Sequence, residues 1–308
     1  MSNIITQKLL KQVSEDNNLE TPESEFALKY LEYYYIENKT KALAQSDLSE
    51  YVRQFQKNFG LEINGKLDAQ TVRAMHYPRC GCPDYKSASG PEFSKWGIKK
   101  LTYYVEKYVN SISKADQDNI LDLAFQQWEE HCELDITRVT TAADANMILS
   151  SGSGRGDNFD GPSGTLAWAY LPPGNSYNGQ LLMRFDLAET WVTNTADRGI
   201  LLLNVACHEF GHFLGLDHSS QQRALMAPYY TAAITKPQAA DDIPRIQGLY
   251  GKRITPIPPV TPPVTPPVTP PVTPPVTPPA GSHKIEITGI NLDQVKVDGK
   301  SLIDFSLI

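Results

Sequence analysis

The segment HEFGHFLGLDH, residues 208–218, combines histidines, a glutamate and glycines at fixed spacing. His208 and His212 are four residues apart, so on a helix their imidazoles project from one face and can bind one metal ion. Gly215 permits the positive φ that ends a helix, and the chain can then bring His218 to the same ion. Three imidazoles with one open coordination position are typical of a catalytic zinc, because a structural zinc has four protein ligands.

Glu209 follows His208 directly and is not needed as a ligand, which suits a general base. Zinc lowers the pKa of a bound water to about 7 and polarises a carbonyl group. Glu209 can take a proton from the attacking water and pass it to the leaving amine. The residues therefore predict hydrolysis of a peptide bond. The alternative, satisfied histidines on an ordinary helix, requires several constrained positions to coincide by chance.

Composition limits the partners that this chain can have. Its 308 residues are 41% hydrophobic, so it can bury a core, and its length indicates about two domains. The formal net charge is −7 and no cluster of Lys and Arg is present, so we do not expect nucleic acid as a partner. No apolar run approaches the roughly 18 residues of a membrane span, and the first residues lack the apolar segment of a secretory signal.

Hydrophobic periodicity indicates the elements that must position the site. Residues 22–76 have helical spacing, interrupted at Gly60 and at an Asn64-Gly65 turn, and Asp68 can cap a third helix, Ala69–Met75. Further along, the segments LTYYVE, ANMIL, TLAWAYL and QLLMRFDL are typical of strands. Helices are expected over residues 114–131, 197–214 and 239–250, the second of which carries the histidines.

The two ends of the chain differ in composition from its middle. Residues 1–20 form an N-terminal tail. Residues 253–282 form a linker rich in Pro and Thr. Within it, residues 256–279 (PIPPVTPPVTPPVTPPVTPPVTPP) contain a VTPP repeat whose prolines exclude helix and sheet and favour a stiff polyproline II spacer, on the order of 75 Å long. Its threonines could carry O-glycans, or the spacer could be bare. Residues 283–308 alternate apolar and polar residues around Asp298-Gly299, which predicts a short β-rich segment, too small to form a core alone.

The sequence resembles the matrixin family of metzincin zinc endopeptidases over about residues 46–251. HEFGHFLGLDH matches the signature HExxHxxGxxH, ALMAPYY places Met226 as in the family's Met-turn, and PRCGCPD is similar to the end of its prodomain. The resemblance implies an α/β (α+β) catalytic domain over residues 91–252, with a twisted, mostly parallel sheet and a long active-site helix. It implies a small all-α, peptidoglycan-binding-like prodomain with a cysteine switch over residues 21–90.

The resemblance also assigns a role to the thiol of PRCGCPD. In matrixins this thiol occupies the fourth zinc position and keeps the zymogen latent, so Cys80 would be the latch. Arg79 and Asp84 would pair to hold the shape of the loop. Cys82 stands at the variable position of the pattern. This second thiol could compete for zinc, oxidise with another cysteine, or simply be a tolerated small residue.

Two further metal sites are usual in the family. This sequence lacks most ligands of one and has the expected ligands of the other. Alignment puts Arg155, Trp168 and Arg184 where the histidines of a second, structural zinc should be, and only Asp157 remains. We therefore expect one zinc, with Asp157 paired to an arginine. A calcium site fits better, because its hard oxygen ligands are present, although solvated loop carboxylates are the alternative. The expected ligands are Asp160, Asp186, Glu189 and backbone oxygens near Gly161, Ser163 and Thr165.

Substrate contacts are expected on both sides of the metal. TLAWAYL resembles the family's edge strand, which pairs with an extended substrate. The wall of the S1′ pocket should include residues 228–236. Met226 is expected to pack beneath the zinc ligands, and Cys207 to lie in the core.

We therefore expect a latent, monomeric zinc endopeptidase that acts on protein or peptide substrates. One alternative is a catalytically silent protein that binds a wall or matrix through its prodomain or C-terminal segment, and another is a peptidase acting on cell-wall peptides. A thiol switch and a calcium site favour an extracellular workplace, although no secretory signal is visible.

Overall fold

The computed structural model describes the chain over residues 10–15, 17, 19–36, 45–85, 94–174, 176–254, 296–297 and 300–301. The chain divides into two compact units, Met1–Val260 and Thr261–Ile308. Nearly all of the predicted spacer, and much of the N-terminal tail, lie outside the described residues. Within the described ranges, no helix is long and apolar enough to cross a lipid bilayer.

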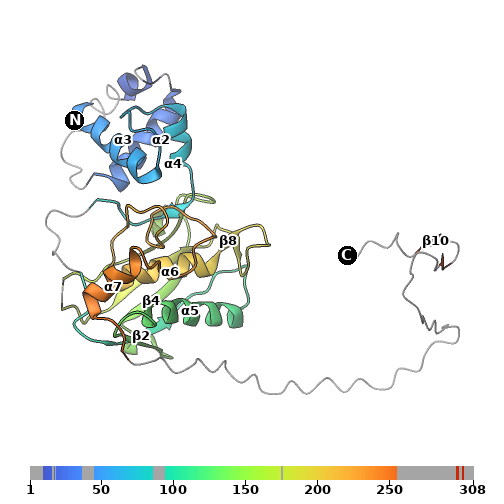
Figure 1. Cartoon of the computed structure of the whole chain (residues 1–308). Helices are drawn as coiled ribbons and strands as arrows, with labels where there is room; N and C mark the ends of the chain where they lie inside the picture. The colour runs from blue at the N-terminus through green and yellow to red at the C-terminus, as the bar shows by residue number, and fades with distance from the viewer. Residues whose placement is uncertain are drawn as a thin grey trace. The chain divides into compact units, whose positions relative to one another are not determined.

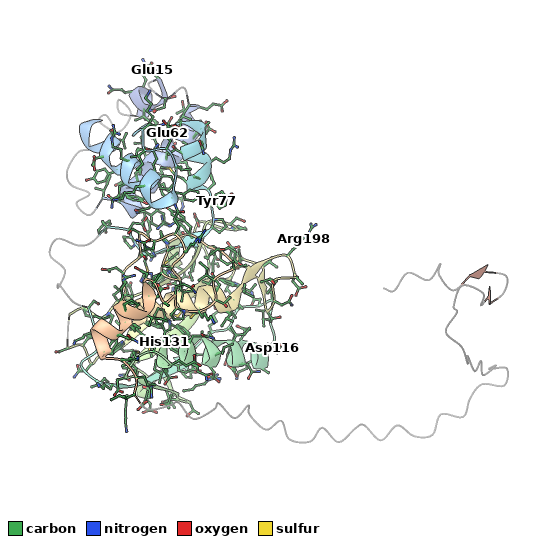
Figure 2. The ribbon with its side chains drawn as sticks, in the orientation of Figure 1. Glu15, Glu62, Tyr77, Asp116, His131 and Arg198 are labelled. Atoms are coloured by element: carbon green, nitrogen blue, oxygen red, sulfur yellow. The ribbon has the colours of Figure 1, made fainter. Side chains whose placement is uncertain are left out.

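Three helices near the N-terminus pack around one apolar core (Figure 1). They are α2 (Thr21–Tyr34), α3 (Gln45–Phe59) and α4 (Ala69–Met75). The predicted cap of α4 is confirmed, since the Asp68 carboxylate accepts a hydrogen bond from the Thr71 backbone N–H at 2.8 Å. Gly60, with a φ of 77°, follows α3 directly. Tyr77 lies where this helical cluster meets the rest of the unit, and its ring contacts Phe59 edge-on (Figure 2).

A six-stranded sheet follows in the order β1-β5-β6-β4-β2-β3. Its strands are β1 (Arg79–Cys80), β2 (Lys100–Val105), β3 (Asp135–Arg138), β4 (Met147–Gly152), β5 (Thr165–Ala169) and β6 (Leu181–Asp186). All neighbouring strands are parallel except β5 and β6. The mostly parallel sheet is therefore confirmed. The thiol-bearing segment itself adds β1 to the edge of the sheet, beside β5.

Two helices, α5 (Lys114–Glu129) and α6 (Leu202–Phe213), pack side by side in the same apolar core as the inner strands (Figure 1). Phe125 and Phe210 stack with ring centroids 3.6 Å apart. The Trp128 indole N–H donates a hydrogen bond to the carbonyl of Cys207 at 2.8 Å. These contacts fix the rotation of α6, which carries the histidines. Cys207 is fully buried, as predicted.

Some element boundaries differ from the prediction. The helix expected from residue 197 begins at Leu202, because Ile200–Leu201 forms strand β8 and pairs with β7 (Trp191–Val192). The last helix, α7 (Asp242–Tyr250), begins three residues later than expected. Short 3-10 helices, η1 (Ala142–Asp144) and η2 (Arg155–Asp157), were not predicted.

The second unit is described only at β9 (Lys296–Val297) and β10 (Lys300–Ser301). These strands pair antiparallel, with Val297 opposite Lys300. The pairing agrees with the hairpin predicted around Asp298-Gly299, whose two turn residues lie outside the described part of the chain.

Candidate metal centre

Three imidazoles converge beside the C-terminal half of α6. His208 and His212 come from successive turns of the helix, and His218 returns after the chain turns at Gly215, which has a φ of 98°. The ring centroids lie 4.9 Å apart for His208 and His212, 5.3 Å for His208 and His218, and 4.7 Å for His212 and His218. The structure therefore brings all three predicted ligands together.

Each histidine is held through its Nδ1 atom. His208 Nδ1 donates to the carbonyl of Leu225 at 2.8 Å, and His212 Nδ1 donates to the carbonyl of Leu216 at 2.7 Å. A carbonyl only accepts, so both rings must carry their proton on Nδ1 and present a bare Nε2. His218 Nδ1 lies 2.8 Å from a carboxylate oxygen of Asp84.

Burial keeps these imidazoles in the neutral form that binds a metal. It lowers the pKa of His208 to about 3, with a further contribution from His218. Burial likewise lowers the pKa of His212 well below its ordinary value. It also lowers the pKa of His218, although Asp84 opposes that change. The Nε2 atoms of His208 and His218 are buried without a hydrogen-bond partner among the described residues, which is the condition expected of atoms reserved for a cation.

Glu209 is fully buried beside this group, and within the described part of the chain neither carboxylate oxygen has a hydrogen-bond partner. Burial raises its pKa to about 8, while the nearby Cys80 thiol acts in the opposite direction. A carboxyl group placed this way can exchange a proton near neutral pH. Its role as the general base stays a prediction.

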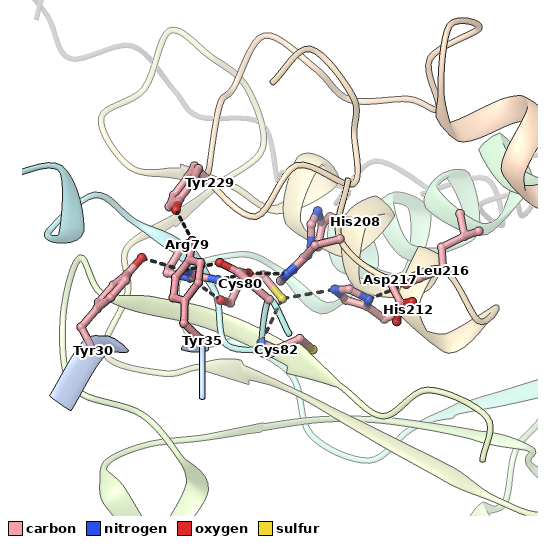
Figure 3. Close-up of polar contacts among 12 residues, drawn as sticks. Tyr30, Tyr35, Arg79, Cys80, Cys82, His208, His212, Leu216, Asp217 and Tyr229 are labelled. Atoms are coloured by element: carbon pink, nitrogen blue, oxygen red, sulfur yellow. Dashed lines mark hydrogen bonds and ion pairs between the residues drawn. The ribbon is translucent and has the colours of Figure 1, made fainter. Parts of the chain in front are cut away.

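The Cys80 sulfur points toward the imidazoles of His208 and His212 (Figure 3). This Sγ lies 3.4 Å from Nε2 of His212, and the Sγ and one nitrogen of each histidine all lie within 4.8 Å of one another. Ligand bonds to zinc of about 2.0–2.3 Å suit four atoms at this spacing. Burial and the neighbouring Cys82 raise the pKa of the Cys80 thiol, so within this closed site a cation beside the sulfur would be needed to favour the thiolate.

Arg79 and Asp84 form the ion pair that the resemblance implies. Arg79 Nη2 and Asp84 Oδ1 are 2.6 Å apart, and both side chains are almost fully buried. Arg79 also donates to the Tyr30 hydroxyl at 2.6 Å, and its guanidinium carbon lies 3.6 Å from the centre of the Tyr34 ring. Because Asp84 also contacts His218, this pair links the helical cluster directly to the metal ligands.

The segment that carries Cys80 is bound along both of its sides. On one side Gly81 donates its backbone N–H to the Ala167 carbonyl of β5 at 2.7 Å. On the other side Cys80 donates its backbone N–H to the Pro228 carbonyl at 2.9 Å. The pocket beside Glu209 is lined partly by residues of the predicted S1′ wall: Pro228, Tyr229, Tyr230, Thr231 and Ile234. The segment therefore runs between the edge strand and this wall.

Two supports of the histidines were missed by the sequence analysis. Gly211 has no room for a side chain, because a Cβ there would lie 2.2 Å from the sulfur of Met226, which is fully buried beneath the helix. Asp242 is fully buried and accepts hydrogen bonds from the backbone N–H groups of Leu225 and Met226 at 2.7 and 3.1 Å. It thereby fixes the carbonyl that orients His208. The only feature of the sequence that could have indicated this role is the presence of an acidic residue, Asp242, at the start of α7.

At the position expected for a structural zinc, the structure has an ion pair. Arg184 contacts the Asp157 carboxylate, which confirms the predicted pairing of Asp157 with an arginine. The Trp168 indole N–H donates to the carbonyl of Asp157 at 2.8 Å, and Arg155 is exposed. The guanidinium of Arg184 therefore supplies a positive charge to Asp157 at the place where a metal ion was expected.

The segments that carry the predicted calcium ligands contact one another, but their carboxylates are not drawn close together. Asp186 is fully buried, and one of its oxygens has no hydrogen-bond partner in the ranges that the structure describes, while Glu189 accepts the backbone N–H of Ser163 at 2.6 Å. Burial raises the pKa of Asp186, and the charge of Asp160 adds to the rise. Burial also raises the pKa of Glu189, with contributions from the charges of Asp186 and Asp160. Among the described residues, these three carboxylates do not gather within 4.8 Å of one another. Gly161 and Ser163 have positive φ, and Thr165 begins β5.

Comparison with known proteins gives two family matches. The family described as Matrixin matches residues 95–251, and the one described as Putative peptidoglycan binding domain matches residues 25–75. The chain is 40% identical over 240 residues to interstitial collagenase of Bos taurus, covering 75% of this chain and 50% of that protein. It is 36% identical over 240 residues to matrix metalloproteinase-20 of Homo sapiens, covering 74% and 48%. The chain thus spans about half the length of the curated relatives it matches.

Proposed function

The chain belongs to the matrixin family, and on that premise we propose that it is a zinc-dependent endopeptidase held latent by Cys80. The observation that carries this proposal is the group of neutral, buried imidazoles facing both Glu209 and a thiol. The proposed substrates are proteins or peptides in extended conformation. We propose that residues 21–90 act as the prodomain and residues 91–252 as the catalytic domain.

The residues present fit a zinc ion. His208, His212 and His218 would hold it through Nε2, since their Nδ1 atoms are occupied by hydrogen bonds or, for His218, by the contact with Asp84. When bound, zinc supplies polarisation of the scissile carbonyl and acidifies water. The open fourth position is the one that the Cys80 sulfur faces, so thiol and water would compete for it.

The chain's own residues supply the rest of the reaction. The free edge of β5 would pair with the substrate backbone once β1 has left, because Gly81 now uses the Ala167 carbonyl. Glu209 would take a proton from the attacking water and return it to the leaving amine. The apolar residues Leu166, Val205 and Ile234 of the neighbouring pocket would receive a substrate side chain.

Removal of zinc tests this function. After the full-length chain is treated with a thiol-blocking mercurial, we expect hydrolysis of a quenched peptide that is lost with 1,10-phenanthroline and regained with added zinc. Metal analysis of the untreated chain should give one zinc per chain, since Arg184 and Trp168 replace ligands of a second site. Activity that survives complete chelation would contradict the proposal, and two tightly bound zinc ions would contradict its stoichiometry.

We also propose calcium binding at Asp160, Asp186 and Glu189, with backbone oxygens near Gly161, Ser163 and Thr165. The buried, unpartnered oxygen of Asp186 is the supporting observation. Calcium at a hundredfold excess over its Kd would stabilise the fold by about 2.7 kcal/mol.

Calcium should therefore raise the melting temperature by roughly 5–10 °C for a domain of this size. Asp186→Asn should abolish the rise by removing the charge of the buried ligand. The matched control is Glu62→Gln, an exposed carboxylate on the helical cluster (Figure 2), which should keep the full rise. The melting temperatures would be measured by calorimetry. If calcium raised the melting temperature of both variants equally, a calcium site at Asp186 would be excluded.

A further inference from the structure

The proposed function uses one thiol of PRCGCPD and leaves the second without a role. Cys82 is 7% exposed, and its thiol donates to the Ala169 carbonyl of β5 at 3.2 Å. Its backbone N–H donates to the Cys80 sulfur at 3.3 Å. Cys82 therefore belongs to the same cluster as the latch and not to the general core.

The two cysteines lie next to each other, and a dashed line in Figure 3 joins the Cys82 backbone nitrogen to the Cys80 sulfur. Cys80 Sγ, Cys82 Sγ and one atom each of Glu209 and His212 all lie within 4.8 Å of one another. Two residues apart in sequence, the Cα atoms can be separated by at most about 7 Å, which is near the upper limit for a disulfide. Gly81 between them supplies the backbone freedom needed to close the small ring.

The other cysteines cannot compete for either sulfur. Cys132 and Cys207 are fully buried elsewhere in the core, and their thiols donate to the carbonyls of Trp128 and Ala124. An internal disulfide at this site would therefore join Cys80 to Cys82.

Resting on the proposed latch, we infer that Cys80 and Cys82 form a reversible disulfide that releases the enzyme from latency. The oxidant is a small disulfide such as oxidised glutathione. One cysteine thiol, after losing its proton, attacks it and expels one glutathione thiol. The other cysteine then attacks the mixed disulfide and expels the second. Two protein thiols are oxidised, and one glutathione disulfide is reduced to two thiols.

The disulfide acts by trapping an open form. Both thiols are buried, so the oxidant reaches them when the segment leaves the cleft transiently. A disulfide sulfur has no thiolate charge to give a metal, so the closed form cannot return until a reductant cleaves the bond. Because one residue separates the two cysteines, the second thiol has a high effective concentration near the first. This favours the internal disulfide over a mixed disulfide with glutathione.

The test incubates the full-length chain in buffers of increasing ratio of oxidised to reduced glutathione. Peptide mapping identifies the bond, and a quenched peptide reports activity. We expect a Cys80–Cys82 bridge and activity to appear together and to be reversed by dithiothreitol. Cys82→Ala and Cys82→Ser should form no bridge and should need at least a roughly tenfold higher ratio for activation. Activation of each variant by a mercurial shows that it is folded and latent.

Separate results identify which proposal has failed. If the mercurial activates the wild type but glutathione leaves Cys82 as a free thiol, the inference is wrong and the latch stands. Equal activation ratios for wild type and both Cys82 variants would likewise overturn it. If neither the mercurial nor glutathione produces activity, the proposed function fails, and the inference fails with it.

Discussion

Glu209→Gln should abolish nearly all peptide hydrolysis while the chain keeps its zinc. General acid–base catalysis contributes about 10²–10⁴-fold, and glutamine has the size of glutamate without a group that accepts the proton. Glu209 is fully buried and none of the hydrogen bonds that orient the histidines involves it, so the ligand geometry should persist. The measurement is kcat/KM for a quenched peptide after mercurial treatment, with zinc analysis of the same sample.

The matched control is Glu106→Gln, which makes the same change at an exposed position at the end of β2. Its kcat/KM should stay within about twofold of wild type, because exposed substitutions rarely matter. A Glu209→Gln variant with full zinc content and less than a tenfold loss would remove Glu209 from the mechanism.

Asp84→Ala should have the largest effect on stability and should also release latency. Burial raises the pKa of Asp84, but Arg79 and His218 outweigh it and hold the pKa well below its usual range. The substitution leaves the Arg79 guanidinium buried without its counter-charge, which costs about 3–5 kcal/mol. Urea unfolding should report the loss, and activity without mercurial should report displacement of the segment.

Glu25→Ala is the control for removal of a carboxylate from an ion pair. Its partner Lys29 is 66% exposed and Glu25 is 52% exposed, so the change should alter the free energy of unfolding by less than about 1 kcal/mol. Latency should be unchanged. An Asp84→Ala protein as stable and as latent as this control would show that the buried pair does not hold the segment.

Features set by local spacing were predictable from the sequence. His208 and His212 share a helical face, Gly215 has the positive φ that the turn requires, and Asp68 caps α4. Each depends on residues at most a few positions apart, where sterics and hydrogen bonding leave few alternatives. The loss of ligands at Trp168 and Arg184 was equally visible, because neither side chain can bind zinc.

Contacts between residues far apart in the chain were not predictable except where the family resemblance supplied them, as it did for Cys80 and the histidines. His218 meets Asp84 across 134 residues, and Tyr34 meets Thr165 across 131. No periodicity encodes such pairs. Strand β1 has only two residues and exists because the edge of β5 binds it. The same reason explains the late start of α6, since Ile200–Leu201 gains a partner in β7.

Replacement of the latch thiol tests the central claim most directly. Full-length wild type, Cys80→Ser and Cys82→Ser would be assayed with a quenched peptide, without mercurial and under reducing conditions. The account predicts that Cys80→Ser hydrolyses the peptide at once, while wild type and Cys82→Ser stay inactive until the mercurial is added. A Cys80→Ser protein that binds zinc yet is as inactive as wild type would contradict the account.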